Sequence, residues 1–340
     1  MRRAIGLTLA ALGAFFLVAA VMTRTYLGGQ LIKFPLNEYV KTTLLAKNVS
    51  YFSPALVRSV HGATIRVTDT VQGDAKAGNS STAVWNEFTY LYDVTNKKEF
   101  AVSTRRAAFN RRTAQLVNCC GASVNGNSTI RQTGVSGYVF PLGTQKQTYY
   151  VFDTTLNRPM PFRYEGTGTI DGISVYRFVE HVAPTQSGSQ KIPGSLVGFK
   201  QSLVTLPVYY SATNTYWVDP STGGVLDTTQ VQKQDLQTST GQQRLLLFQG
   251  DIIMTPQSER VAVGLDSTGR TELLWFQDIV PLIAAVAGAL GWARSAQDTD
   301  LVDAVPRYLP GWTKPMLRVP VAREFLTWNL LLVLRRTEPG

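Results

Sequence analysis

The sequence predicts a mainly β fold: an antiparallel sheet or barrel-like extracytoplasmic domain, with an N-terminal transmembrane helix and a second helix towards the C-terminus. Three observations predict it. An uncharged run stands near the N-terminus, strand-like alternation recurs through the middle of the chain, and a second apolar run follows the last strand. We therefore divide the 340 residues into a cytoplasmic start with a membrane anchor (1–24), a β-rich domain (25–272), a second transmembrane helix (273–293) and a tail, cytoplasmic or on the membrane surface (294–340).

The first apolar run, Ala4 to Met22, contains nineteen residues and no charge. At 1.5 Å per residue a helix of this length spans close to the ~30 Å hydrocarbon core of a bilayer, and only a helix satisfies its own backbone there. Arg2 and Arg3 before the run favour a cytoplasmic N-terminus, so that the following domain is exported. The alternative is a cleaved signal peptide, but the run is longer than the usual apolar core of ~7–15 residues.

The middle of the chain carries the alternation of half-buried strands. In 84–94, Phe88, Tyr90 and Tyr92 fall on one face, and Glu87 and Asp93 on the other. Further along, Asp171 and Gly172 separate two strand-like segments and predict a tight hairpin, because both residues tolerate positive φ. We expect polar loops at 74–81 and 187–198 and a short helix at 256–270.

The second apolar run, Leu273 to Ala293, has an uninterrupted portion of only fifteen residues, from Ile279 on. Asp278 near the middle of a bilayer would cost ~3 kcal/mol, so it must lie at an interface if the segment spans. The alternative is a buried or interfacial helix. Beyond it, Val321 to Leu334 is apolar and too short to cross, and we expect it on the membrane surface.

The charge balance excludes few partners. There are 33 Lys and Arg against 23 Asp and Glu, a net charge of +10, but the basic residues are scattered and no nucleic-acid-binding motif is present. We therefore expect no nucleic-acid partner. The basic residues are typical of solvated strand edges and membrane flanks, with attraction to an anionic envelope surface as the alternative.

The two cysteines, Cys119 and Cys120, are adjacent. Two thiols and two distant histidines, His61 and His181, do not make a zinc site, so we expect no metal. The pair could close a strained eight-membered disulfide ring in an oxidising compartment, stay as two small buried residues on opposite sheet faces, or bridge to another chain.

The sequence shows no catalytic motif. There is no phosphate-binding loop, no dinucleotide fingerprint and no nucleophile elbow, so we expect no cofactor, no catalytic residue and no enzyme. His181 is expected to be structural. The carboxylates Asp69, Asp153, Asp171 and Asp219 are scattered, and the last two are explained as turn residues.

Aromatic residues are frequent in the expected strands. We interpret most of them as sheet core, and a fraction could line an elongated apolar pocket for an acyl chain, which would leave no polar motif. The residues concerned are Tyr149, Tyr150, Phe152, Tyr176, Phe178, Tyr209, Tyr210, Tyr216 and Trp217.

Several stretches of the sequence form a pattern together with the N-terminal span: 109–113, 117–120, 138–144, 149–153, 164–166, 171–172, 176–178, 217–220 and 222–223. In these stretches, and over residues 1–290 as a whole, the chain resembles the actinobacterial porin PorA family, which is defined by a domain of unknown function. The layout of such proteins is similar to that of scavenger receptor class B proteins, whose exported β-rich domain carries a lipid tunnel; this is an analogy of layout. The chain departs from the family pattern after Gly291, where a long tail follows.

Together these observations predict a cell-membrane protein that binds, passes or scaffolds an apolar envelope component, a lipid or a lipoglycan. Membrane lipid is the expected partner, and the sequence identifies no ligand-binding residue. A porin-like pore is the first alternative, and an envelope hydrolase or transferase is the second. The pore reading meets a difficulty, because a membrane barrel and a helical anchor are two different ways of spanning a bilayer.

Overall fold

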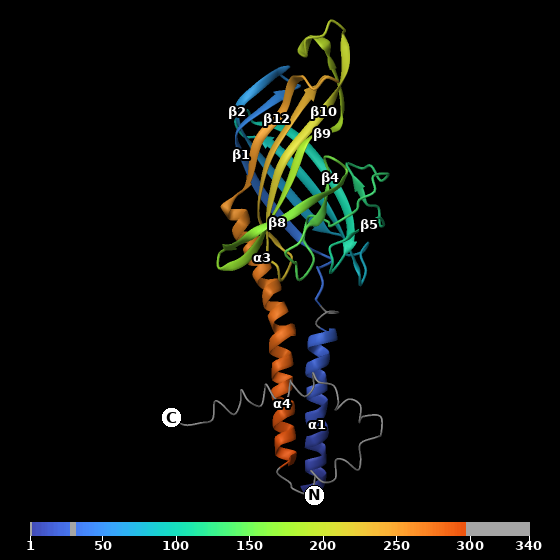
Figure 1. Cartoon of the computed structure of the whole chain (residues 1–340), viewed down its shortest axis with the longest axis vertical. Coiled ribbons are helices and arrows are strands. Elements are labelled where there is room, and N and C mark those ends of the chain that lie inside the picture. The colour runs from blue at the N-terminus through green and yellow to red at the C-terminus, as the bar shows by residue number, and fades with distance from the viewer. Residues whose placement is uncertain (1, 28–31, 297–340) are drawn as a thin grey trace. The chain divides into compact units, whose positions relative to one another are not determined.

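A computed structural model describes residues 2–27 and 32–296 of the chain (Figure 1). These residues form two compact units. One contains 2–27 together with 276–296, and the other contains 32–275. The predicted fold class is confirmed: the described chain is mainly antiparallel sheet, curled into a half-barrel, with apolar helices near both ends of the described region.

The larger unit is built around one twelve-stranded sheet. Its order, β5-β4-β3-β2-β1-β12-β11-β10-β9-β8-β7, follows the chain except at the centre, where the first and last strands pair; β6 pairs with β4 beside this path. The strands are β1 (Tyr39–Ser53), β2 (Arg58–Gly73), β3 (Thr82–Asp93), β4 (Lys98–Asn110), β5 (Leu116–Val117), β6 (Ser123–Val124), β7 (Tyr149–Asp153), β8 (Arg158–Ile170), β9 (Ile173–Pro193), β10 (Leu203–Val218), β11 (Val225–Gln237) and β12 (Gln243–Met254).

The tightest turn is the one that the sequence predicts most directly. Ile170 pairs with Ile173, and Asp171 and Gly172 between them have φ of 45° and 81°. Positive φ at both central positions is the conformation that a two-residue hairpin needs. The expected loop at 187–198 is wrong over its first half, because β9 continues to Pro193 and pairs with β10 as far as Leu203. Its polar residues lie on a long strand in place of a loop.

The sheet curls strongly, so that side chains from distant strands meet on its concave face. Phe100 of β4 packs edge-on against Tyr51 of β1, with ring centroids 4.8 Å apart, and its ring lies 5.8 Å from that of Phe248 of β12. Four strand-to-strand steps separate β4 from β12 in the sheet, so this contact requires the curl.

Two of the apolar clusters on the concave side join strands that are distant in the sequence. The upper cluster consists of residues from β1, β2 and β12: Leu44, Ala46, Val49, Tyr51, Ala63, Ile65, Val67, Phe248, Ile252 and Met254. The aromatic cluster joins β2–β4 to β7–β10 through Phe34, Val71, Ala83, Trp85, Phe109, Ala114, Val135, Phe140, Tyr149, Val151, Phe162, Phe178 and Val218.

One helix of the larger unit, α3 (Pro256–Leu274), begins directly after β12. Thr255 caps its N-terminus, accepting a hydrogen bond from the Ser258 N–H, and a proline follows at the first helical position. The Ser258 hydroxyl in turn accepts a bond of 2.8 Å from the Thr43 N–H of β1. The expected short helix at 256–270 therefore exists, and its first turn is tied to the sheet.

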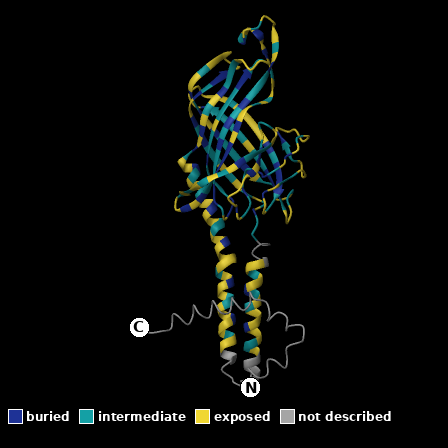
Figure 2. Ribbon diagram, viewed as in Figure 1, coloured by how far each residue is buried: buried dark blue, intermediate teal, exposed yellow. Residues whose placement is uncertain are grey.

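The smaller unit is a pair of apolar helices. It contains α1 (Arg2–Met22), the π-helical turn η1 (Thr23–Leu27), the π-helical turn η3 (Trp275–Ile279) from Phe276 on, and α4 (Val280–Ala296). Both helical segments are long and apolar enough to cross a membrane, and Figure 2 shows them largely exposed. Apolar side chains such as Phe15 (65% exposed) and Leu282 (63%) face outwards, as expected of helices in lipid.

Glycines bring these two helices into close contact. A Cβ added at Gly288 would lie 2.8 Å from the Gly13 carbonyl oxygen, and one at Gly13 would lie 2.8 Å from the Gly288 carbonyl oxygen. Small residues at such positions are the usual means by which helices pack in membranes. The expected helix over 273–293 thus exists. The expectations for the tail, including Val321–Leu334, lie outside the described residues.

Candidate functional site

Side chains of β3 alternate between the concave face and the outer face of the sheet. The two carboxylates of this strand, Glu87 and Asp93, are on the concave face. Trp85 (3% exposed) and Asp93 (1%) are buried on the concave side, whereas Phe88 is 46% exposed on the outer side. The alternation predicted from the sequence is present, but the Phe88, Tyr90 and Tyr92 face is the outer one. Ala83 and Trp85 pack in the aromatic cluster with residues of β4. Because side chains alternate along a strand, this packing turns the odd-numbered residues of β3 inwards and the even-numbered ones outwards.

A first polar group, here the Arg105 group, lies on the concave face of β2–β4. Arg105 is 7% exposed; its Nε donates to Gln132 Oε1 at 2.9 Å and its Nη1 to the Ser136 carbonyl at 2.8 Å. Its guanidinium also lies over the rings of Tyr138 and Phe152, 4.9 and 5.4 Å from their centroids. The remaining nitrogen, Nη2, is buried without a partner.

Two carboxylates complete the Arg105 group. Glu87 is the direct cross-strand neighbour of Arg105 and accepts a hydrogen bond of 3.1 Å from the Tyr138 hydroxyl. Asp69, on β2, accepts one of 3.2 Å from Thr89. Burial, and next the negative charge of Glu87, raise the pKa of Asp69 to about 8. Asp69, one of the carboxylates that are scattered in the sequence, therefore lies near Glu87 on the concave face of the sheet.

A second polar group, here the Glu180 group, lies on the concave face of β9–β11. Glu180 is 1% exposed, and its cross-strand partner Asn214 donates from Nδ2 to Glu180 Oε2 at 2.5 Å. Thr228, on β11, is 7% exposed. Three polar atoms of this group are buried and have no partner among the described residues: Glu180 Oε1, Asn214 Oδ1 and Thr228 Oγ1.

Burial dominates the electrostatics of the Glu180 group. It raises the pKa of Glu180 to about 7, against the hydrogen bond from Asn214, which lowers it. Burial also raises the pKa of Asp153, whose Oδ1 accepts the N–H groups of Thr155 and Leu156. Burial, followed by the negative charges of Glu180 and Glu87, raises the pKa of the partly buried Tyr216, so this tyrosine interacts with both polar groups.

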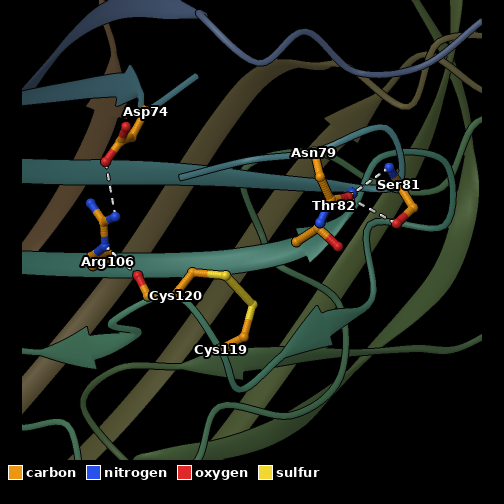
Figure 3. The surroundings of a disulfide bond; sticks show 7 residues. All are labelled: Asp74, Asn79, Ser81, Thr82, Arg106, Cys119 and Cys120. Carbon is orange, nitrogen blue, oxygen red and sulfur yellow. Dashed lines mark hydrogen bonds and ion pairs between the residues drawn. A yellow bond between two sulfur atoms is a disulfide. The ribbon is translucent and has the colours of Figure 1, made fainter. Parts of the chain in front are cut away.

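The cysteines lie outside this interior. Cys119 and Cys120 form a disulfide in an exposed turn, and Arg106 donates from Nε to the Cys120 carbonyl at 2.8 Å (Figure 3). Arg106 also bonds Asn86 and the Asp74 carboxylate, and its hydrogen bond lowers the pKa of Asp74. Beside this turn the outer face has an open hollow of about 380 Å³, lined by Thr70, Gln72, Asn86, Glu87, Phe88, Thr104, Arg105, Arg106, Ser123 and Gly126.

A third acidic group lies where α3 meets the turn between β10 and β11. Asp219 is fully buried and accepts a hydrogen bond of 2.7 Å from Arg270 Nη1. Asp219 also caps its own turn through the Ser221 N–H, as expected from the sequence. Asp266 of α3 accepts from the Thr222 hydroxyl, and burial followed by a contact with Asp219 raises its pKa to about 7.

The remaining sequence candidates are not brought together. His61 shares a hydrogen bond with Ser50, and His181 is exposed beside Thr213 and Glu165. Within residues 2–27 and 32–296, no group of three or more His, Cys, Asp or Glu side chains is placed to hold a metal. Glu180, Asn214, Thr228 and Arg105 were not predicted as site residues. The signal that could have identified them is a polar residue at a strand position whose side chain faces inwards. Recognising such a position requires the register of the strands, which the sequence does not show.

Comparison of the sequence with known proteins identifies the family of this chain. The family model described as Porin PorA matches residues 5–295. A protein named Porin PorA from Corynebacterium resistens is 34% identical over 73 residues, 21% of this chain and 17% of that protein. An uncharacterized methyltransferase from Mycolicibacterium gilvum is 51% identical over 53 residues, 16% of this chain and 20% of that protein. The matches to these relatives cover a fifth or less of their length. The family match, in contrast, covers both apolar helices and the whole sheet, so the chain is a membrane or cell-envelope protein that belongs to the porin PorA family.

Proposed function

We propose that this chain is a membrane-anchored protein of the cell envelope whose curled sheet, outside the cytoplasm, binds an amphipathic lipid or lipoglycan and passes it on, without catalysing a reaction. The observation that carries the proposal is the polarity of the sheet. Its concave face is mainly apolar and contains a few buried polar groups, whereas its convex face carries both charged and apolar side chains.

The interior of the sheet is lined by apolar side chains of the kind that bind an acyl chain. The upper cluster extends over β1, β2 and β12, and Leu91 and Phe100 pack against it from β3 and β4. Most drug-sized and lipid ligands bind in sites lined by such side chains with a few polar groups that fix their orientation. The Arg105 and Glu180 groups supply polar atoms of that kind.

The outward-facing side chains of the sheet argue against the alternative function, a pore formed by a membrane-embedded barrel. Arg66, Arg106, Arg177, Lys233 and Asp251 lie on the convex face, whereas a membrane-embedded barrel needs an apolar band there. The family name favours a pore, the second candidate. With this sheet, a pore would have to be formed by the helix pairs of several copies of the chain.

The orientation proposed here rests on the sequence. Arg2 and Arg3 precede the first span, and the positive-inside rule then leaves the sheet outside the cytoplasm. An accessible-cysteine or reporter fusion near residue 150 tests this point, and a cytosolic reporter would overturn it.

Photocrosslinking tests lipid binding by the full chain. The protein, reconstituted in phosphatidylcholine nanodiscs, is incubated with a diazirine-bearing C16 fatty acid, irradiated, digested and mapped by mass spectrometry. We expect adducts on inward residues of β1, β2 and β12, such as Ile252 (6% exposed), and few on its neighbour Ile253 (50% exposed), which faces outwards. Adducts confined to 2–27 and 276–296 would overturn lipid binding by the sheet. Stepwise conductance of the same protein in planar bilayers would support a pore instead.

A further inference from the structure

The Glu180 group offers hydrogen-bond acceptors that nothing in the described structure uses. Glu180, Asn214 and Thr228 are each more than nine-tenths buried, and each has a polar oxygen without a partner. Leaving a buried polar atom unpaired costs free energy comparable to a lost hydrogen bond, so native proteins rarely do so without a ligand or an ordered water. Three such atoms lie together on adjoining strands, and each of them needs a hydrogen-bond donor or acceptor from outside the protein.

The three oxygens lie on the same face of three consecutive strands. Asn214 is directly opposite Glu180 in the β9–β10 pair, and Thr228 of β11 is opposite Tyr216, two residues from Asn214. Direct neighbours across a sheet have Cβ atoms roughly 5 Å apart and diagonal ones roughly 7 Å. The hydroxyls of a sugar ring are spread over a comparable width.

The chemistry of the group selects against charged ligands. Of the three free atoms, Asn214 Oδ1 only accepts, Glu180 Oε1 accepts when ionised, and Thr228 Oγ1 can do either. An anion would find few donors. A cation would need firm negative charge, but Glu180 loses its charge readily because burial raises its pKa to about 7. A neutral group rich in O–H donors satisfies the oxygens without burying net charge.

Apolar side chains continue the site on one side. Val182, Tyr210 and Ala212 form a buried cluster, and Leu156 and Met160 of the β7–β8 hairpin pack against it. Tyr210 and Ala212 precede Asn214 on the same face of β10. The polar atoms therefore border apolar side chains, and the Tyr210 hydroxyl, which interacts with Asn214, lies where the two meet.

We propose that Glu180, Asn214 and Thr228 form a headgroup subsite for the hydroxyl groups of a glycosyl or polyol lipid. This inference deepens the proposed function and rests on it. It adds the class of ligand, a neutral glycolipid, and the residues that distinguish its headgroup from that of a phospholipid.

Titration of the full chain with headgroup-matched probes tests the subsite. The protein is held in amphipol, and dodecyl glucoside, dodecylphosphocholine and dodecyltrimethylammonium are each added below the critical micelle concentration in a calorimeter. All three probes have the same C12 chain, so differences in affinity report the headgroup. We expect the glucoside to bind about tenfold more tightly, the effect of one or two buried hydrogen bonds.

Two variants and one matched control assign the effect. Thr228→Val and Asn214→Leu are expected to abolish the preference for glucoside. Thr229→Val is expected to retain it, because Thr229 alternates to the outer face of the same strand. Thr228→Val should not lower the melting temperature, since valine replaces an unpartnered buried hydroxyl with a group of similar shape.

The possible failures are distinct. If all three probes bind the wild-type chain equally, water satisfies the three oxygens and the headgroup subsite is wrong, while lipid binding stands. A preference that survives in both Thr228→Val and Asn214→Leu also overturns the subsite. If no probe binds, the proposed function fails together with the subsite.

Discussion

Arg270 of α3 donates a hydrogen bond of 2.7 Å to Asp219, a carboxylate with no exposed surface at the turn between β10 and β11. Asp266, one helical turn earlier than Arg270, contacts the same carboxylate and Thr222. The helix that precedes the second apolar segment is therefore fixed to the sheet by one cation and two acids. Removal of Arg270 would leave the buried carboxyl groups of Asp219 and Asp266 next to each other without a positive charge.

Arg270→Met is expected to destabilise the chain by about 2 kcal/mol. Breaking a buried ion pair costs more than this, but the Arg270 side chain is 40% exposed, so solvent screens part of the interaction. The corresponding fall in melting temperature, measured for the full chain in detergent, is about 6 °C. Arg260→Met, at an exposed position of the same helix, is the control and should change it little. Equal stability of the two variants would contradict the role of the ion pair.

The stability of the α3 contact should fall as pH rises. Burial raises the pKa of Asp266 to about 7 in the folded chain, above its ordinary value of 3.8, so folding favours the protonated carboxyl. That contribution is present below pH 4 and is lost as pH rises through 7. Asp266→Asn, which mimics the protonated acid, should be more stable than wild type at pH 8 and gain little at pH 4. A stability difference that does not change between these pH values would show that Asp266 does not titrate in this range.

Gly288→Val should separate the two apolar helices. The added Cβ would lie 2.8 Å from the Gly13 carbonyl oxygen and 3.0 Å from the Leu17 backbone nitrogen, and neither backbone atom can yield without moving the helices apart. The measurement is whether the N-terminal helix co-purifies with the remainder after cleavage at a protease site inserted near residue 30. Gly264→Val is the matched control, because a Cβ at Gly264 meets nothing within 4 Å. Loss of co-purification in both variants would point to a general effect of valine.

Replacement of both cysteines by serine should lower the melting temperature less than Arg106→Leu does. A disulfide between adjacent residues closes almost no loop, so it constrains the unfolded chain little. Arg106, by comparison, makes three hydrogen bonds of 2.8–2.9 Å, to Cys120, Asn86 and Asp74, and holds the turn on β4. Differential scanning fluorimetry compares the variants. A larger effect of the cysteine replacement would mean that the ring itself maintains this surface.

Local patterns were enough to predict those parts of the fold that depend on local physics. Asp171 and Gly172 specify their hairpin because few other residues accept positive φ, and the run from Ala4 to Met22 specifies a helix by composition alone. The end of β9 was missed because Gln186 to Gln190 are polar and held by pairing with β10, a contact with residues further along the chain.

The candidate site depends on register and could not be predicted in the same way. Asp69 and Glu87 meet because β2 and β3 pair with a particular offset, and Glu180 and Asn214 meet for the same reason on β9 and β10. A shift of one residue would move every one of these side chains to the other face. The alternation of 84–94 was visible in the sequence, but the direction of each face was set by Trp85 and its tertiary contacts.

The pairing of the first strand with the last has a consequence for biogenesis. Leu45 of β1 is matched with Ile253 of β12, 208 positions later, so the edge of β1 has no partner until almost all of the domain has been synthesised. At ordinary translation rates that wait lasts roughly 10–40 s, during which the nascent hairpins β1–β4 expose an open β-edge prone to aggregation. We expect a chain built in this way to need chaperones that cover the open edge, so that its yield responds to their abundance more than to its own equilibrium stability.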